Sequence, residues 1–526
     1  MQLGIPSRGT GVRPYLVIAE RVSILAAVLG LYYLLMLRYP IIYGGDTVVR
    51  LVNPSRILNG HQLPLLQVLI QYTTRWSSGP EGVFILMALI SGIACAGLHA
   101  LTLELTGDRR AAWLAAAFYV SHPFVLYYSR VPYQEPLLFA CLAWGYYYLF
   151  RPESPAARVL SSLLIGAACL TRYEGWIAAL AAALFQIRLR RREEGKLRPS
   201  TAVKALVCFG WAPALWILWN RGLSPAGTHV LDLGLHWGRF YRPYFIVKSA
   251  LWWTESAVAL LAVLGFAGSW LDARMRRDER FHSILAFLAL FLAALLFSGH
   301  GIEPEPTRMV TEREAFVPIG ILVFYAAIGS SWLIRGLENS PLSGPLSRVG
   351  VPLLAVLMVT GYSFDRGFHR IAAANDDPEL KSDYQVAQFL AQRRAGALVL
   401  AAPLPTATLT TYLDSVERWS GKEGRAKALL LLQKAETTPL DYQRVLVFSW
   451  MGKNRVLAAD QLRDLDRQRI ERFLQEKRID YLVVFSDFAP VAEHERALLA
   501  WCADGRMPEF EVRNGDKSAR IFRIAY

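Results

Sequence analysis

Acidic residues and arginines recur in the polar loops of this sequence, at positions where they could act on a charged lipid. Asp46 follows Gly44 and Gly45, just after the first apolar segment. Glycines let a backbone turn sharply, and a carboxylate at the edge of hydrocarbon can act as a general base toward a hydroxyl or an amine. The alternative is that Asp46 caps a helix that begins near Thr47. Spacing alone leaves both interpretations open.

Charged side chains also stand at the two loops that follow. Glu135 precedes Pro136 at the start of an apolar segment, where a negative charge suits the helix dipole. It is either such a charge, a second acidic group of a site, or a metal ligand. Arg172 and Glu174 lie between two minimal apolar segments, where ionisable groups are costly and are often functional. A purely structural Arg172–Glu174 ion pair is the alternative.

Two later loops add arginines and aromatic residues. Arg308 and Arg313 have planar guanidinium groups that suit a phosphate or a pyrophosphate, unless the charges of this loop pair with one another. The loop of residues 220–247 contains His236 and Trp237, and its mixture of aromatic and polar residues suits sugar stacking and equally an interfacial aromatic belt. His229 and His236 are seven residues apart with one aspartate nearby, which is a weak metal signal.

Composition predicts a membrane protein and argues against a nucleic-acid partner. Hydrophobic residues make up 54% of the 526 residues, and the mean hydropathy is +0.27. The net charge of +14 comes from basic residues that recur between apolar runs, as in cytoplasmic loops. About eleven segments are apolar enough to span a bilayer as helices. They centre on residues 22–38, 82–104, 111–128, 134–150, 157–171, 174–188, 203–219, 249–270, 282–298, 315–333 and 349–363.

Loop charge decides the predicted topology. With eleven spans, every dense basic group falls on the cytoplasmic side, as the positive-inside rule expects. If the short segments 157–171 and 174–188 were one kinked helix, the densest group would face out. We therefore expect two short helices joined by an outer turn at Arg172, and a C-terminal region on the outer side. The basic groups placed inside are Arg8–Arg21, Arg109–Arg110, Arg151–Arg158, Arg188–Lys204, Arg274–Arg280 and Arg335–Arg348.

The sequence predicts two domains, a transmembrane domain of residues 1–363 and an α/β domain of residues 364–526. After about Phe364, amphipathic helical patterns alternate with short apolar runs, which is typical of a small domain with a partly parallel sheet. Neither a GxGxxG nor a GxxxxGK[ST] loop is present, so nothing indicates nucleotide binding. The expected helices are residues 383–394, 461–477 and 491–502, and the expected strands are residues 397–400, 444–448, 481–485 and 519–524.

In this order, the motifs resemble the GT-C superfamily of integral-membrane glycosyltransferases, in particular the bacterial branch of protein-mannosyltransferase-like and aminoarabinose-transferase-like enzymes. The resemblance covers roughly residues 15–335. It departs from the mannosyltransferases at Thr47, which stands where their close Asp-Glu pair continues. The matching segments are Gly44–Asp46 with Arg56–Pro64, Tyr133–Leu137, Leu170–Trp176, and Arg313 ahead of Pro318.

The resemblance implies a single inverting displacement on a sugar carried by a polyprenyl phosphate. Asp46 would be the base that deprotonates the acceptor, and Glu135 would be the second catalytic residue, positioning the acceptor or an arginine. Arg172, Arg308 and Arg313 would hold the donor phosphate and offset its developing charge. The expected substrate-binding residues are Glu174, Tyr133, His61, His236 and Trp237.

The implied partners are the lipid donor, the bilayer, and a glycan, lipid or protein acceptor. No cofactor is required by these residues; a divalent cation is compatible with them but is not indicated. The implied location is the bacterial inner membrane, with the active site and the C-terminal domain on the periplasmic side. The competing interpretations are a flippase for a lipid-linked saccharide, which should show repeated halves and polar residues at the midplane, and a non-catalytic subunit of polysaccharide assembly.

Overall fold

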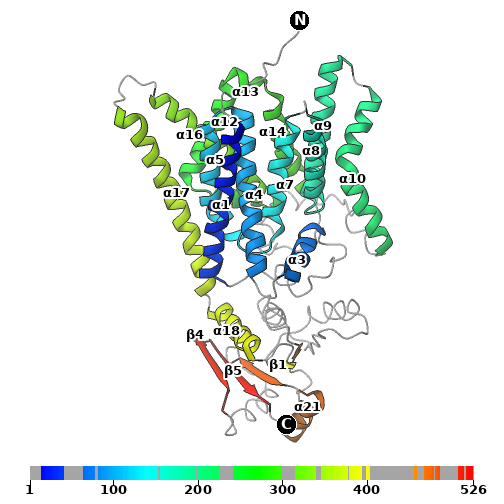
Figure 1. The fold of residues 1–526 in the computed structure, drawn as a ribbon, viewed down its shortest axis with the longest axis vertical. Helices are drawn as coiled ribbons and strands as arrows, with labels where there is room; N and C mark the ends of the chain where they lie inside the picture. The colour runs from blue at the N-terminus through cyan, green and yellow to red at the C-terminus, as the bar shows by residue number, and fades with distance from the viewer. Residues whose placement is uncertain are drawn as a thin grey trace. The chain divides into compact units, whose positions relative to one another are not determined.

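The computed structural model describes the helical part of the chain more fully than the C-terminal part (Figure 1). The elements of the chain fall into two units. We call the described residues up to Ile371 the helical unit and those from Ala372 onward the sheet unit, and we treat each by itself. The described residues are 14–40, 63–76, 81–151, 154–196, 198–223, 241–297, 314–338, 345–376, 378–393, 398–402, 455–458, 467–478, 480–485, 507–514 and 517–524.

Apolar segments of the sequence form the helices of the helical unit. These are α1 (Pro14–Arg38), α3 (Leu65–Trp76), α4 (Glu81–Thr106), α5 (Arg109–Ser121), α6 (Pro123–Tyr128), α7 (Gln134–Leu149), α8 (Pro155–Cys169), α9 (Glu174–Glu194), α10 (Pro199–Leu223), α11 (Tyr241–Trp253), α12 (Ser256–Leu271), α13 (Ala273–Arg277), α14 (Glu279–Phe297), α16 (Phe316–Glu338) and α17 (Pro345–Asp376).

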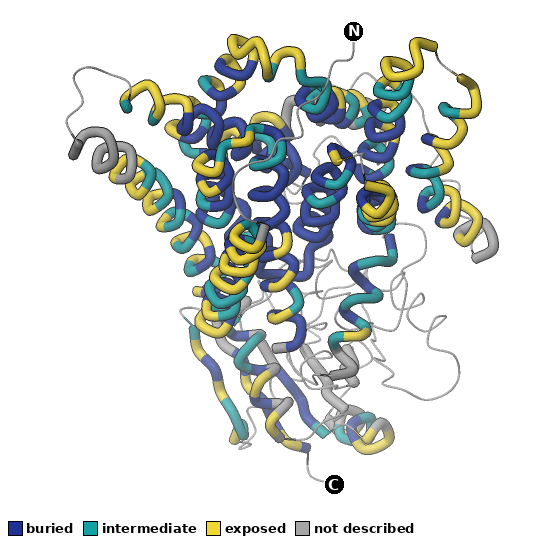
Figure 2. Tube along the Cα trace, turned by 45° about the horizontal axis from the view of Figure 1, so that its top comes forward, coloured by how far each residue is buried: buried dark blue, intermediate teal, exposed yellow. Residues whose placement is uncertain are grey.

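Helices α4 and α7 lie at the centre of the helical unit and are buried along most of their length (Figure 2). Helix α4 packs against α1, α5 and α7, and α7 also packs against α8. Helices α12 and α16 also pack closely against each other. Exposed leucines, isoleucines and valines cover the outer helices, for example Leu160, Val207 and Leu260. Such an outer surface is expected for a bundle whose surroundings are apolar.

Two predicted segments are broken rather than continuous. The segment 111–128 ends as α5 at Ser121 and restarts as α6, because the side chain of His122 caps the new helix and Pro123 occupies its first turn. The segment 249–270 bends by 115° between Trp253 and Ser256. The sequence analysis treated each segment as continuous, although polar residues stand at both breaks, His122 at the first and Thr254 and Glu255 at the second.

The number of membrane crossings is not fixed at eleven. Among the described residues, four helices are long and apolar enough to cross a membrane, or five if the bent pair of α11 and α12 counts as one span. The other predicted segments also form helices, but several are short: α7 has 16 residues and α8 has 15. The amphipathic helix α3 was not predicted at all, because we interpreted residues 39–81 as one loop.

Ion pairs join some of the basic groups that were predicted to share one side to acidic residues of distant loops. Arg192 at the end of α9 lies 3.3 Å from Glu279 at the start of α14. Arg110 at the start of α5 lies 2.6 Å from Glu338 at the end of α16. These two ion pairs place loops that are far apart in sequence side by side, and the orientation in the membrane stays a prediction.

The sheet unit contains a five-stranded mixed sheet in the order β2-β1-β3-β5-β4. Parallel pairing joins β1 to β2 and to β3, whereas β5 pairs antiparallel with β3 and β4. Helix α18 packs against β4 and β5, and Phe389 stacks on Phe510 with 4.4 Å between ring centroids. The elements are α18 (Pro378–Arg393), β1 (Leu398–Ala402), β2 (Arg455–Ala458), α21 (Arg467–Lys477), β3 (Tyr481–Phe485), β4 (Phe510–Asn514) and β5 (Lys517–Arg523).

Three of the described strands, β1, β3 and β5, lie on apolar runs that predicted strands, whereas β2 and β4 were not predicted. The predicted strand 444–448 and the predicted helix 491–502 lie outside the described residues. Helix α17 continues through the predicted domain boundary at residues 363 and 364, so the chain crosses that point without a loop. The division of the two domains and the side of the membrane on which the second one lies remain predictions.

Replacing Gly329 by alanine is expected to destabilise the helical unit. A Cβ atom at Gly329 would overlap the carbonyl oxygen of Leu261, because α12 and α16 approach closely at this point. Backbone cannot move aside as a flexible side chain can, so we expect a loss of roughly 1–3 kcal/mol. The measurement is the thermal unfolding midpoint of the purified protein in detergent. Gly336→Ala on the same helix is the control, since no atom lies within 4 Å of its added Cβ.

Candidate functional site

The turn between α8 and α9 presents Arg172 and Glu174 side by side. Helix α8 ends at Cys169, and the backbone N–H groups of Thr171 and Arg172 both donate to the carbonyl oxygen of Ala168, each at 3.1 Å. Helix α9 starts at Glu174. Two helices therefore meet at a tight turn of four residues, as the two-helix interpretation of the loop charge predicted.

Gly175 allows this turn to close. A Cβ atom there would overlap the backbone of Ala168, so any larger residue would force α9 away from α8. The indole N–H of Trp176 donates to the carbonyl oxygen of Cys169 at 3.1 Å and closes the turn from the other side. The backbone of the turn is thus held independently of its charged side chains.

Arg172 joins two carboxylates from different helices. Its Nε lies 2.8 Å from Glu174 Oε1 and its Nη2 lies 2.7 Å from the same atom. Its Nη1 donates to Oε1 of Glu135, the second residue of α7. The exposed fractions of the side chains are 18% for Arg172, 3% for Glu135 and 11% for Glu174. The structure therefore brings together three residues that the sequence placed in two separate loops.

The cluster carries more negative than positive charge. Burial works against the charged form of Arg172, but Glu135 and Glu174 outweigh it and raise the pKa of Arg172 above its ordinary value. Glu314, just before α16, is buried and contributes in the same direction. We did not single out Glu314 from the sequence, because its loop contains several acidic residues and only the fold selects this one.

Two polar groups of the cluster remain available to a ligand. Arginine has five N–H donors, and the contacts with described residues occupy Nε and one N–H on each of Nη1 and Nη2. Within the part of the chain that the structure describes, one N–H on each of the two Nη atoms is therefore without an acceptor. Oε2 of Glu135 is buried and has no hydrogen-bond partner among the described residues. The site thus offers two donors and one acceptor at the end of α7.

The chain just before α3 is attached to both sides of this cluster. The side-chain amide of Gln134, next to Glu135, donates to the carbonyl oxygen of Leu63 at 3.1 Å. The backbone N–H of Leu65 donates to the carbonyl oxygen of Leu170 at 2.9 Å. The end of the first predicted outer loop is therefore held against the Arg172 turn.

The remaining predicted site residues divide into one that the structure describes and six that it does not. Tyr133 caps α7 and is buried, with its ring 5.4 Å from that of Tyr128. Among the described residues, no group of three histidine, cysteine, aspartate or glutamate side chains is placed to hold a metal ion. The structure places four of the predicted site residues: Tyr133, Glu135, Arg172 and Glu174. The other six lie outside the described residues: Asp46, His61, His236, Trp237, Arg308 and Arg313.

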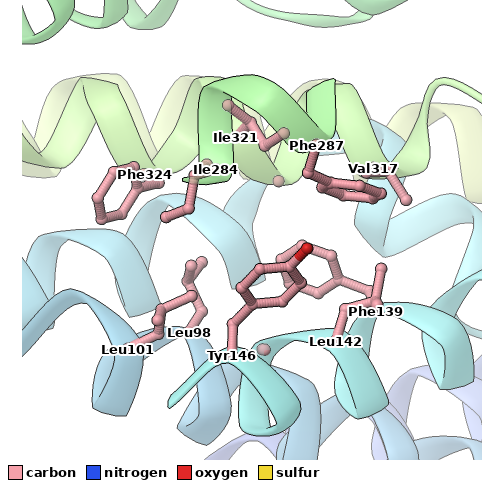
Figure 3. A pocket seen from close by; sticks show the side chains of 12 residues that line it. Leu98, Leu101, Phe139, Leu142, Tyr146, Ile284, Phe287, Val317, Ile321 and Phe324 are labelled. Carbon is pink, nitrogen blue, oxygen red and sulfur yellow. The ribbon is translucent and has the colours of Figure 1, made fainter. Parts of the chain in front are cut away.

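An apolar pocket lies one helical turn inside the cluster. It has a volume of about 50 Å³, and α4, α7, α14 and α16 supply its walls (Figure 3). Phe139 follows Glu135 by four residues on α7, and Val317 follows Glu314 by three. Tyr146 crosses the pocket, and its hydroxyl lies 3.4 Å from the carbonyl oxygen of Ala178 on α9. The arrangement suits a ligand with a charged head and an apolar tail.

Over nearly its whole length, the fold of this chain is similar to that of solved structures. The chain is similar to ArnT from Cupriavidus metallidurans bound to undecaprenyl phosphate, with a TM-score of 0.56 and 11% identity over 96% of this chain and 97% of that one. It is also similar to apo ArnT from the same organism, with a TM-score of 0.53 and 12% identity over 96% and 98%. No family model matches the sequence, and no curated protein matches it. This likeness of fold agrees with the resemblance that the motifs indicated.

Removing the charge of Arg172 alone is expected to destabilise the protein more than removing the charges of Arg172 and Glu135 together. Arg172→Met leaves Glu135 as an uncompensated buried carboxylate, at a cost of about 3–5 kcal/mol. The double variant Arg172→Met with Glu135→Gln removes that charge and should recover part of the loss. The measurement is the unfolding midpoint in detergent of Arg172→Met, of Glu135→Gln and of the double variant. If the effect of the double variant equals the sum of the effects of the two single changes, the two side chains are not coupled.

Proposed function

We propose that this chain is a membrane glycosyltransferase that takes a sugar from a polyprenyl-phosphate donor. The observation that carries the proposal is the position of the Arg172 cluster directly over an apolar pocket, within the fold shared with ArnT. A pocket lined by apolar side chains suits an isoprenoid tail, and the charged groups at its end suit a phosphate and a sugar. The bound undecaprenyl phosphate of the similar ArnT structure supports this class of lipid.

The donor phosphate would lie against the two remaining N–H groups of Arg172. A phosphate accepts hydrogen bonds from a planar guanidinium in a paired geometry. Arg308 and Arg313 are proposed to supply the further positive charge, because the described cluster by itself is negative. Glu314 lies close enough to Arg172 to raise its pKa. Arg313 directly precedes Glu314 in sequence, which supports the proposal that Arg313 belongs to the same site.

The proposed reaction is a single displacement with inversion. Asp46 takes the proton from an acceptor hydroxyl or amine, whose electron pair forms the new bond to the anomeric carbon. The bond from that carbon to the phosphate oxygen breaks on the opposite face, and its electrons leave with the polyprenyl phosphate. The arginines offset the charge that develops on that phosphate. The acceptor, which is a glycan, a lipid or a protein, is not specified by these groups.

Glu135 is proposed to orient the acceptor through its free oxygen while its other oxygen holds Arg172. The sugar is proposed to contact Glu174, Tyr133, His61, His236 and Trp237, of which the structure places Glu174 beside Arg172. The reaction is proposed to take place on the periplasmic side of a bacterial inner membrane. The basic groups of the loops predicted to lie inside support this orientation.

The Asp46→Asn variant is expected to abolish turnover of the donor. Asparagine keeps the size of the side chain but cannot accept the proton, and loss of a general base typically lowers the rate 10²–10⁴-fold, a rough range. Release of polyprenyl phosphate from a panel of polyprenyl-phosphate sugars would be followed with the protein in lipid. Asp376→Asn is the control, because Asp376 is exposed and carries the same change.

Turnover that survives in Asp46→Asn would contradict Asp46 as the base. If the wild-type protein binds these donors but consumes none of them, with or without acceptors, the transferase itself is contradicted. Movement of the intact donor across the bilayer would then favour the flippase interpretation.

Filling the apolar pocket is expected to weaken the use of long-tailed donors. Ile321→Trp adds an indole to the pocket wall on α16 and should raise KM for a long polyprenyl donor by about ten-fold, the effect of losing roughly 1.4 kcal/mol of apolar contact. A short-chain isoprenoid analogue should be affected less. Leu337→Trp on the exposed face of the same helix is the control. Equal effects on long and short donors would show that the tail does not occupy the pocket.

A further inference from the structure

Two tryptophans and two arginines meet on the surface of the helical unit at the bend between α11 and α12. We call this group the corner; its residues are Trp252, Trp253, Arg366 and Arg370. Arg366 on α17 reaches this bend, and its Nη1 lies 2.8 Å from Glu255 Oε1. Its Nη2 donates to the carbonyl oxygen of Trp252 at 3.1 Å. Arg366 thus holds the end of α11 and the start of α12 against α17, and its charge is matched by Glu255.

Arg370, one turn further along α17, is charged and exposed at the same corner. Its guanidinium carbon lies 4.7 Å from the ring centroid of Trp252 and 5.0 Å from that of Trp253. Among the described residues, no carboxylate lies within ion-pair distance of it. Trp253 is buried against Phe124, 5.3 Å away between centroids, so one wall of the corner is fixed. The two indoles orient the guanidinium but do not neutralise it.

The face of α17 that leads to this corner is apolar and exposed (Figure 2). Leu354, Leu357, Met358 and Tyr362 are each more than half exposed and follow one another at helical spacing. Arg366 and Arg370 continue that spacing by one and two further turns. An apolar ridge that passes through a tyrosine to arginines is the usual order from the hydrocarbon of a membrane to its headgroup layer.

Helix α11 presents a matching face. Leu251 and Trp252 are about half exposed, and Lys248 lies one turn before Trp252 on the exposed side. The helix meets α12 at 115° rather than continuing it. If α12 crosses the bilayer, α11 lies at a steep angle to that direction, as interfacial helices with apolar and basic residues do. Positive charge from two helices therefore converges where the apolar surface ends.

We propose that this corner binds the phosphate of an anionic phospholipid, with Arg370 as its main ligand and Lys248 as a second cation. The acyl chains would lie along the apolar ridge of α17, from Tyr362 toward Leu354. A phosphodiester carries one negative charge and is matched by one guanidinium that has no carboxylate partner among the residues that the structure describes. The exposed position favours a lipid of the surrounding bilayer over the donor lipid, whose proposed tail site is the pocket between α4, α7, α14 and α16. The proposal is independent of sugar transfer.

The test is retention of lipid by the full-length protein in native mass spectrometry. The wild-type protein, exchanged into mixed micelles with equal phosphatidylglycerol and phosphatidylcholine, should retain an excess of phosphatidylglycerol. Arg370→Gln should lower that excess about five-fold, the equivalent of one basic residue at an anionic surface. Arg370→Lys keeps the charge and should retain part of the excess. Arg523→Gln, an exposed arginine of β5, is the control with the same loss of charge.

Three results would overturn the proposal. The first is equal retention of the two phospholipids by the wild-type protein. The second is an equal loss in Arg370→Gln and Arg523→Gln, which would reflect net charge rather than a site. The third is a parallel experiment with polyprenyl phosphate in which Arg370→Gln loses that lipid and keeps phosphatidylglycerol, which would assign the corner to the donor lipid. Because Arg370 is exposed, the unfolding midpoint of Arg370→Gln should equal that of the wild-type protein. An equal midpoint shows that a loss of lipid is not caused by misfolding.

Discussion

The ion pairs of Arg172 are the interaction on which the proposed site depends. A guanidinium and a carboxylate that are both withdrawn from water are tolerated only when each satisfies the other. Arg172 meets this requirement with Glu135 from α7 and Glu174 from α9, so one side chain fixes the relative position of two helices and the turn between them. The first outer segment then joins through Leu63 and Leu65. The proposed site is thus held together by contacts within the protein itself.

Close backbone contacts support this arrangement from elsewhere in the helical unit. Gly175 lets α9 approach α8, and Gly265 and Gly329 let α12 approach α16. Without a hydrophobic force between helices in lipid, such contacts and buried polar groups hold a bundle together. Helix α16 therefore contacts α12 at Gly329 and lines the pocket at Gly320. Packing and binding use different faces of the same helix.

The sequence predicted most of the apolar helices and part of the site. Periodicity and loop charge located α8 and α9 as separate helices, and the cost of burying Arg172 and Glu174 marked them as candidates before any contact was known. The ion pair to Glu135 could not be predicted, because it depends on which helices pack together. For the same reason Glu314 and the pocket were missed. Helix α3 was missed because an amphipathic helix of 12 residues lacks the continuous apolar run that marks a span.

Tyr146 links the apolar pocket to the helix that presents Glu174. Its ring lies across the pocket and its hydroxyl faces the carbonyl oxygen of Ala178, one turn along α9 from Glu174. If a lipid tail fills the pocket as proposed, its contact with the Tyr146 ring is one hydrogen bond away from the helix whose first residue holds Arg172.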